Sequence, residues 1–539
     1  MKKIFLILFT LNVFSQNIDV NNSFFYNEII RNEIDSLTSF TILPIDISKL
    51  NLENSLFFNS GIKNLTSKNK KFRLSFFPIE NTSEYNTNIP FKSNNGIMLP
   101  NVGLQNVLSA GFNFKFKNFS FQIKPEFHYM ENNFFEEFHE NHFPIIWERR
   151  YRLWNNIDMP VRFGNKPRKT LSIGQSNLFF DINNVRVGYS TENQWWGPSR
   201  ENSIMMSNNS RGFGHYTIQT SKPINTSYGK IEFKYIIGKL KNSGFLPPNI
   251  DGKSSGTKYY IPKDLRANYQ DFSSLNAFIF TFSPKHIKGL SFGIIRWLQT
   301  YYEKNKIFNT NSIKKIFRLS FLKNIDTKQN KASGFFLKFK EDTFEIYGEL
   351  YRNSPSNKYT LNQSLNPNLK KVAHTLGIHK TFNNNLLLNW EWTRMEQKSE
   401  ILTHNLGSWY EHNYLVNGFT NFGEVIGSKI GPGSNSHSLT LKKIFNKKFI
   451  GLGLEIIEND NDFYHISFSD SGDYRRYWKD FTFKFFYFKE FSNFNLSLIS
   501  NYTRSLNYNW GLDRTIEPWY HAGIDKNNFN IKIKFHYFL

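Results

Sequence analysis

An alternation of apolar and polar residues recurs through most of this chain, and it constrains the fold more than any other feature. The clearest run closes the chain, where one face carries Phe529, Ile531, Ile533, Phe535, Tyr537 and Leu539. The intervening residues include Lys532, Lys534 and His536. A period of two predicts β-strands with one apolar face. A soluble sandwich and a membrane barrel share this period, so the connections between strands have to decide between them.

The connections in the last part of the chain alternate between short and long. We predict nine strands, at 333–339, 343–351, 372–381, 386–392, 438–444, 449–456, 481–488, 494–502 and 529–539. The short connections are 340–342, 382–385, 445–448 and 489–493, and the long ones are 352–371, 393–437, 457–480 and 503–528. Short turns at one rim and long loops at the other are typical of outer-membrane barrels. An aromatic C-terminal strand then lies at the periplasmic rim, and the long loops face outward.

The strand spacing predicts the size of the barrel. Nine strands in residues 333–539 correspond to about 23 residues per strand, which gives about 19 strands over residues 96–539. Because bacterial barrels have even strand numbers, we expect about 18 strands, with 16 as the alternative. The predicted fold class is therefore all-β, a transmembrane antiparallel β-barrel with a small N-terminal helical segment in the periplasm. Carboxylates such as Glu345, Glu349 and Glu391 should point into the lumen, away from lipid.

The N-terminal residues differ from the rest of the chain. Lys2 and Lys3 precede an eleven-residue apolar stretch, Ile4 to Phe14, which predicts a secretory signal at 1–15. Residues 16–95 are expected to form a periplasmic helical or irregular segment, with an amphipathic helix within 24–36. The barrel is then expected to span 96–539. The chain has no cysteine, so it can form neither a disulfide nor a thiolate metal site.

The amino-acid composition indicates which classes of partner the protein can bind. Aromatic residues make up 17% of the chain and the formal charge is +23, or +21 once Lys2 and Lys3 are removed with the signal. A basic surface suits acidic polysaccharide, the phosphates of lipopolysaccharide, or nucleic acid. A secreted barrel rarely meets nucleic acid, so we expect no nucleic-acid partner. Outer-membrane lipid and lipopolysaccharide are expected neighbours, and we expect a monomer.

The stretch from Gly188 to Pro223 carries one group of candidate binding residues. They are Trp195, Trp196, Arg200, Asn208, Asn209 and Arg211. Aromatic faces stack on the C–H faces of sugars, while amides and guanidinium groups bond to hydroxyls. The alternative is that Trp195 and Trp196 belong to the aromatic belt at a membrane interface.

Two predicted loops carry a second group of candidates. One contains Arg149, Arg150 and Trp154, and the other contains Arg475, Arg476 and Trp478. Basic and aromatic residues together suit acidic sugars through charge pairing and stacking. The alternative is that the aromatic residues lie at the membrane interface and the arginines contact lipopolysaccharide phosphates.

The sequence gives little support for catalysis. It contains neither a G-x-S-x-G nor an H-E-x-x-H motif. His139 and His142 are three residues apart in an acidic stretch without a recognisable third ligand, so a solvated loop is favoured over a metal site. We therefore expect no catalytic residue, no metal and no cofactor.

Two segments resemble a known family. Gln194-Trp195-Trp196-Gly197-Pro198, followed by Ser207-Asn208-Asn209, resembles the capsule assembly Wzi family. Asn417 to Gly427, followed by Ile430-Gly431-Pro432-Gly433-Ser434, is similar to a second glycine-rich segment of that family. The resemblance implies an 18-stranded outer-membrane barrel with a small periplasmic helical bundle. It also implies a lectin-like role in holding capsular polysaccharide at the cell surface.

The leading functional hypothesis is a non-catalytic outer-membrane protein of a Gram-negative bacterium that binds and anchors capsular or exopolysaccharide. One alternative is a diffusion channel whose lumen charges set its selectivity. Another is an outer-membrane enzyme that acts on glycan or lipid.

Overall fold

The fold is described here from a computed structural model of the chain. The described residues are 17–18, 41–46, 63–66, 72–91, 93–139, 142–245, 271–303, 310–318, 321–322, 328–354, 370–397, 406–469, 476–513 and 522–539. The predicted signal at 1–15 and the predicted helix within 24–36 lie outside these residues.

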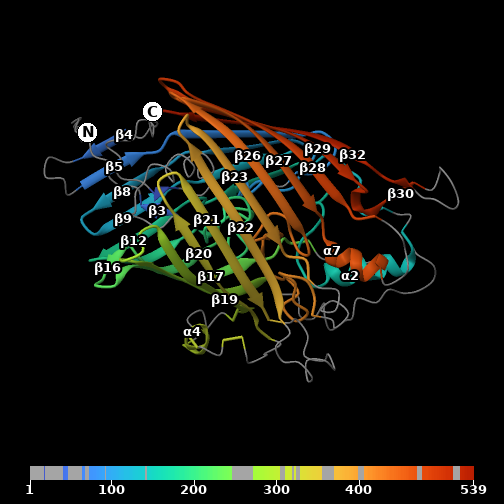
Figure 1. Ribbon diagram of the computed structural model, residues 1–539, viewed down its shortest axis with the longest axis horizontal. Helices are drawn as coiled ribbons and strands as arrows, with labels where there is room; N and C mark the ends of the chain where they lie inside the picture. Colours follow the sequence, from blue (N-terminus) through green and yellow to red (C-terminus); the bar gives the residue numbers. More distant parts are fainter. Residues whose placement is uncertain are drawn as a thin grey trace, which may run out of the picture.

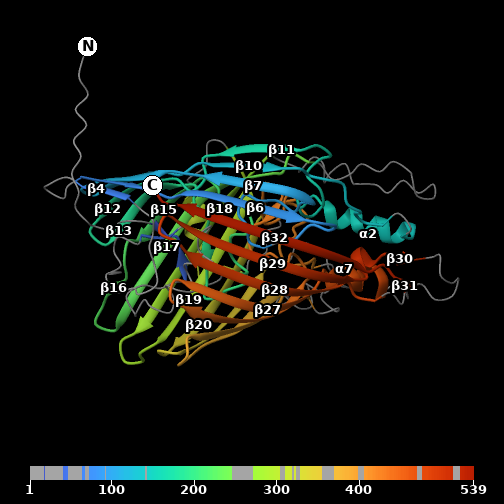
Figure 2. The same cartoon turned by 90° about the horizontal axis from the view of Figure 1, so that it is seen from above.

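Most of the described chain forms one large antiparallel sheet, whose long strands run side by side around a common axis (Figures 1 and 2). Its strands in the first half are β4 (Lys63–Thr66), β5 (Phe72–Phe76), β6 (Ile79–Asn86), β7 (Gly103–Ser109), β8 (Phe112–Phe116), β9 (Phe119–Ile123), β10 (Glu126–Met130), β11 (Arg168–Ser172), β12 (Asn177–Ile182), β13 (Val185–Ser190), β15 (His215–Thr220), β16 (Ile224–Asn225) and β17 (Gly229–Lys241). Those in the second half are β18 (Phe272–Pro284), β19 (Leu290–Tyr301), β20 (Asn330–Lys340), β21 (Phe344–Asn353), β22 (Lys371–Phe382), β23 (Leu386–Arg394), β26 (Asn435–Phe445), β27 (Lys448–Glu458), β28 (Lys479–Glu490), β29 (Phe494–Leu506) and β32 (Lys526–Tyr537).

Neighbouring strands in the sheet follow chain order. From β17 to β32, each sheet strand pairs with the next one along the chain. The last strand, β32, also pairs with β6 near the N-terminus, from Asn530 opposite Asn86 to Tyr537 opposite Ile79. Local interruptions divide several strands. Phe77-Pro78 separates β5 from β6, and Lys124-Pro125 separates β9 from β10. A proline cannot donate to the ladder, which explains a break at these places.

The period-two predictions are confirmed where alternation is strict. All nine strands predicted after residue 333 are present as β20 to β23, β26 to β29 and β32. Phe112 to Ile123 alternates in the same way and forms the β8–β9 hairpin, with Phe116 opposite Phe119. The expected boundary at residue 96 is wrong, because β5 and β6 already belong to the sheet. These two strands were missed because polar residues and Pro78 interrupt their alternation.

The two faces of the sheet have different chemistry. Apolar side chains such as Leu439, Leu441 and Leu452 are exposed on the outward face. The opposite face is buried and carries polar groups, including the predicted inward carboxylates Glu345, Glu349 and Glu391. This alternation, apolar outside and polar inside, is that of strands with one face against lipid.

Two connecting segments fold against the concave face of the sheet. We call residues 191–214 and 406–434 together the plug. The plug contains three short strands, β14 (Trp195–Trp196), β24 (Thr420–Asn421) and β25 (Glu424–Val425). Near the N-terminus, β2 (Ile42–Leu43) pairs with β14, and β1 (Asn17–Ile18) pairs with β3 (Ile45–Asp46). Almost every described side chain of the plug is buried.

Other connections extend beyond the ends of the strands, opposite the rim that holds the short turns. They contain α2 (Pro144–Trp154), α7 (Asn461–Tyr464), the π-helix η3 (His465–Ser469), the 3-10 helix η4 (Tyr508–Trp510), β30 (Leu512–Asp513) and β31 (Ala522–Gly523). Figures 1 and 2 both place α2 beside α7 at this end, far from the C-terminus. The connection between β19 and β20 contains α4 (Thr310–Ile316), which instead packs against the sheet, with Ile316 beside Leu298 of β19. Among the described residues, no helix has the length and apolar character required to cross a bilayer.

Candidate functional site

The Trp pair lies inside the plug. Trp196 is 0% exposed and packs in an apolar cluster with Ile204, Met205 and Met206. Trp195 is also buried, and its indole N–H donates to the carbonyl of Ser199 (2.9 Å). The interpretation of this pair as a membrane-interface belt is wrong, because neither ring faces outward. Alternation could not reveal this location, since the pair lies in a connection between two sheet strands.

Arg200 joins the plug to the wall of the sheet. Its guanidinium donates to Glu345 of β21 (3.2 Å), and both side chains are buried. Its backbone N–H donates to Glu391 of β23 (2.7 Å). Glu391 also accepts from the backbone N–H of Asn202 (2.7 Å) and from the hydroxyl of Tyr347 (2.6 Å). One buried carboxylate therefore holds a turn of the plug, which is a structural role for this arginine segment.

Asn209 joins the two halves of the plug, and Asn208 joins the first half to the segment around Asn94. Asn209 donates through Nδ2 to the carbonyl of Val425 (2.9 Å), and Asn208 donates to the carbonyl of Asn94 (2.9 Å). The backbone N–H of Ser207 donates to the carbonyl of Ile426 (2.9 Å). The two segments that resemble the family therefore bond to each other, although more than two hundred residues separate them.

Arg211 marks the edge of this network. Its guanidinium lies 3.0 Å from the centroid of the Phe422 ring, and the residue is partly buried. Burial lowers the pKa of Arg211 to about 10, so it remains a cation at neutral pH. A cation stacked on an aromatic face at short range is stabilising.

The remaining candidates lie in a different place. We call α2, α7, η3, η4 and the residues 476–478 the loop lobe. Its apolar centre is formed by Phe138, Ile146, Phe463, Phe468 and Trp510. Trp147, Trp154 and Trp478 pack around this centre and are only partly buried. The structure thus brings together the two predicted clusters, which more than three hundred residues separate along the chain.

Within α2, the two adjacent arginines have different roles. Arg150 is buried, lies 3.7 Å from Asp460, and stacks over the rings of Trp154 (5.0 Å) and Phe463 (5.3 Å). Arg149 is partly buried and donates to the carbonyls of Ile466 and Ser467 (3.0 Å to the latter). Both arginines therefore fasten α2 to α7 and η3, while Arg149 retains some exposure.

Two of the three residues in the second predicted cluster, Arg476 and Trp478, are among the described residues. Arg475 lies outside the described residues, and Arg476 is exposed. The indole of Trp478 donates to Asp480 (2.9 Å) and to Ser505 (2.9 Å), and its ring meets that of Trp510 edge-on at 5.4 Å. Trp478 is therefore fixed in orientation.

Sequence reasoning missed the residues that hold the lobe together. Asp460, Phe463 and Trp510 carry no local motif, and they become neighbours only through the fold. Burial raises the pKa of Asp460 to about 6, against the lowering effect of Arg150. Burial likewise lowers the pKa of Arg150 below its ordinary value.

The histidine stretch next to α2 has a packing role. The ring of His142 stacks on Phe138 at 4.0 Å, and its Nε2 lies 3.1 Å from the carbonyl oxygen of Asn509. In the part of the chain that the structure describes, no three histidine, aspartate or glutamate side chains are grouped as a metal site requires.

An apolar outward face, a polar concave face and long loops gathered at one end define an outer-membrane β-barrel protein. A family model described as "Capsule assembly protein Wzi" matches residues 91–462. The chain therefore belongs to the capsule assembly protein Wzi family, and its location is the outer membrane of a Gram-negative bacterium.

Solved structures with the same fold include Wzi from Escherichia coli, described as an outer-membrane, carbohydrate-binding β-barrel involved in group 1 capsule assembly. It is 13% identical with a TM-score of 0.55, and the alignment covers 98% of this chain and 99% of that chain. OccAB2 of Acinetobacter baumannii matches at 10% identity with a TM-score of 0.41, covering 85% of this chain and 96% of that chain. The search of curated proteins found no match.

Proposed function

We propose that this protein binds capsular or exopolysaccharide with its loop lobe and anchors the polymer at the cell surface without catalysing a reaction. The observation that carries the proposal is the lobe itself. It places partly exposed tryptophans and arginines from two distant loops on one rigid apolar centre. Rigid aromatic faces bordered by cations suit a polymer of acidic sugars.

The fold supports a surface position for this lobe. We infer that the sheet closes through the β32–β6 pairing into a barrel that spans the outer membrane. Counting each interrupted strand (β5–β6, β7–β8, β9–β10, β11–β12 and β15–β16) as one, and leaving out β4, gives 18 strands. The short turns and the C-terminus then face the periplasm, and the loop lobe faces outward.

Within the lobe, we assign different roles to different side chains. Trp147 and Trp154 stack on sugar rings, and Arg149 contributes charge beside them. Arg152 adds a second cation, with a side chain that is 74% exposed and paired with Glu148. Arg476 approaches from the second loop. Arg150 positions α2, because its guanidinium is buried among aromatic rings and beside Asp460.

The family supports polysaccharide binding in general. Its description names capsule assembly, and the Escherichia coli relative is described as carbohydrate-binding. We extend this to anchoring of a polymer by a monomer that is surrounded by outer-membrane lipid and lipopolysaccharide.

The plug counts against a diffusion channel. Phe419 of the plug stacks on Trp297 of β19 at 4.1 Å, and Gln299 of the same strand donates to the carbonyl of Gly418 (2.7 Å). Lys371 of β22 donates to the carbonyls of Ser408 (2.8 Å) and Glu411 (2.9 Å). Packing of this density across the concave face leaves little space for a solute.

Deletion of the gene tests the anchoring role. Cells without the protein should make normal amounts of surface polymer but release it into the medium, and complementation should restore attachment. If the polymer stays attached in the deletion strain, the anchoring role is wrong. If total synthesis falls, the protein acts earlier than proposed.

A further inference from the structure

A second charged surface lies at the opposite end of the molecule from the loop lobe. On the rim that carries the short turns, four lysines belong to the outward face of the sheet between β22 and β28: Lys380 of β22, Lys443 of β26, Lys448 of β27 and Lys489 of β28. Each continues a row of outward apolar residues. Leu376 and Ile378 precede Lys380, and Leu439 and Leu441 precede Lys443, at the two-residue spacing of one strand face. We call these four residues the rim lysines.

The register places two of the rim lysines directly opposite each other. Lys448 pairs with Lys489 in the β27–β28 ladder, on the same outward face. Two like charges in this position destabilise a sheet unless an anion lies between them. Aromatic rings border both, with Phe445 4.9 Å from the Lys448 ammonium and Phe491 4.6 Å from that of Lys489.

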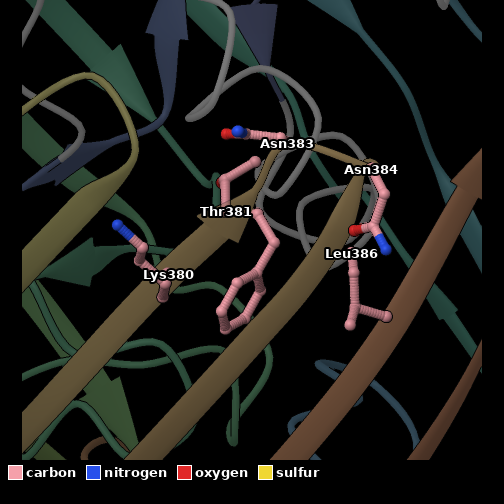
Figure 3. A pocket seen from close by; sticks show the side chains of 6 residues that line it. Lys380, Thr381, Asn383, Asn384 and Leu386 are labelled. Carbon is pink, nitrogen blue, oxygen red and sulfur yellow. The ribbon is translucent and has the colours of Figure 1, made fainter.

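The other two rim lysines border a surface hollow at the β22–β23 turn. The hollow measures about 470 Å³ and is lined by Lys380, Thr381, Phe382, Asn383, Asn384 and Leu386. Figure 3 shows Lys380 and Leu386 on neighbouring strands, with Asn383 and Asn384 at the turn above them. Lys443 lies beside Leu386 in the β23–β26 ladder and donates to the carbonyl of Asn384. The hollow therefore combines apolar side chains, turn amides and the Lys380 ammonium, and the Lys443 ammonium lies at its edge on the Asn384 carbonyl.

The remaining contacts of this surface leave room for an anion. Lys380 donates to the hydroxyl of Thr343 (3.0 Å), which is a neutral partner. The nearby exposed carboxylates, Glu341 and Asp342, lie in the β20–β21 turn. A charge on the lipid face is costly at the membrane centre but inexpensive at the interface, where aromatic residues also gather.

From this arrangement we propose that the rim lysines bind the phosphate headgroups of anionic phospholipid in the inner leaflet of the outer membrane. The acyl chains then lie along the apolar rows that continue from Lys380 and Lys443. This proposal rests on the orientation given under the proposed function, with the short turns in the periplasm. We assign phospholipid and not lipopolysaccharide as the ligand, because lipopolysaccharide occupies the leaflet at the other end of the barrel.

The experiment measures lipid retention by the full chain in nonionic detergent, using native mass spectrometry. Equal amounts of dioleoylphosphatidylglycerol, dioleoylphosphatidylcholine and lipid A are offered together. The wild-type chain should retain phosphatidylglycerol at least tenfold over phosphatidylcholine. The variant K380Q/K443Q/K448Q/K489Q should retain the two lipids equally. The control K117Q/K222Q/K285Q/K288Q loses the same charge from exposed turn lysines and should change retention less than twofold.

Several results would overturn the proposal. These are equal retention of the two phospholipids by the wild-type chain, equal losses in both variants, or a preference for lipid A that depends on the rim lysines. Heat-dependent mobility in gels reports whether each variant is folded. If the fourfold variant fails to fold, the variant K448Q/K489Q removes only the opposed pair. Its preference for phosphatidylglycerol over phosphatidylcholine should be at least threefold weaker than that of the wild-type chain.

Two further measurements separate this proposal from the proposed function. Polysaccharide binding should be unchanged in the rim variants, whereas lobe variants should keep the lipid preference. A cysteine introduced as Asn384→Cys should resist a membrane-impermeant thiol reagent in intact cells. Labelling from outside would show that the rim faces the medium, which would overturn the lipid assignment without affecting sugar binding by the purified chain.

Discussion

The plug and the loop lobe contain the same kinds of residue but differ in what those residues contact. In the plug, Trp196 is fully buried and Arg200 is paired with Glu345, so the side chains are used within the fold. In the lobe, Arg152 is largely exposed and Trp154 is partly so. Tryptophan and arginine in a short motif therefore do not by themselves indicate a binding surface. The two regions differ in whether contacts within the fold already use the hydrogen-bonding groups and aromatic faces of these side chains.

The largest effect should come from breaking the contact between the plug and the barrel wall. Glu391→Ala removes the acceptor for the backbone N–H groups of Arg200 and Asn202 and for the hydroxyl of Tyr347. Because buried donors without partners are costly, we expect a loss of about 3–5 kcal/mol, measured by thermal unfolding in detergent. Glu391→Gln, which keeps an acceptor, should lose less, and Glu341→Ala in an exposed turn should have no effect. If Glu391→Ala abolished polysaccharide binding at unchanged stability, the assignment of a structural role to the plug and a binding role to the lobe would be wrong.

An intermediate effect should come from the exposed cations of the lobe. The variant R152A/R476A removes two positive charges without opening a cavity. Affinity for an acidic polysaccharide should fall about tenfold at low salt, and the difference from the wild-type chain should shrink as salt screens the charges. Affinity for a neutral polymer of similar length should not change. A loss of the same size for both polymers would point to damaged packing instead of lost charge.

The smallest effect concerns pH. Burial raises the pKa of Asp460, which caps α7 in the lobe, to about 6. A carboxylic acid whose pKa is higher in the folded than in the unfolded chain favours the folded state when it is protonated. This stabilisation is complete below the unfolded-state pKa of about 4, and it is lost as the pH rises through the folded-state pKa of about 6. We therefore expect the lobe to resist proteolysis better at pH 5 than at pH 7.5, by the order of 1 kcal/mol. Asp460→Asn should weaken this dependence, and an unchanged pH profile would contradict it.

The parts predictable from sequence were those governed by local periodicity. Strands such as β26 and β27 alternate strictly and are joined by a short turn, so their type and pairing follow from the residues alone. The interrupted strand β5–β6 was missed because Pro78 breaks the pattern. For the site, local chemistry identified the right residue types in both regions. It could not tell exposed from buried, because Trp196 is covered by Met205 and Met206 only after the plug has folded.

The most direct test of the account is binding of the host's own surface polysaccharide to the detergent-purified chain and to the variant W147A/W154A. We expect the wild-type chain to bind the polymer. The lobe variant should bind at least tenfold more weakly, with an unfolding temperature within a few degrees of the wild-type value. Equal binding by the two proteins, or no binding by the wild-type chain, would contradict the assignment of the loop lobe as the polysaccharide site.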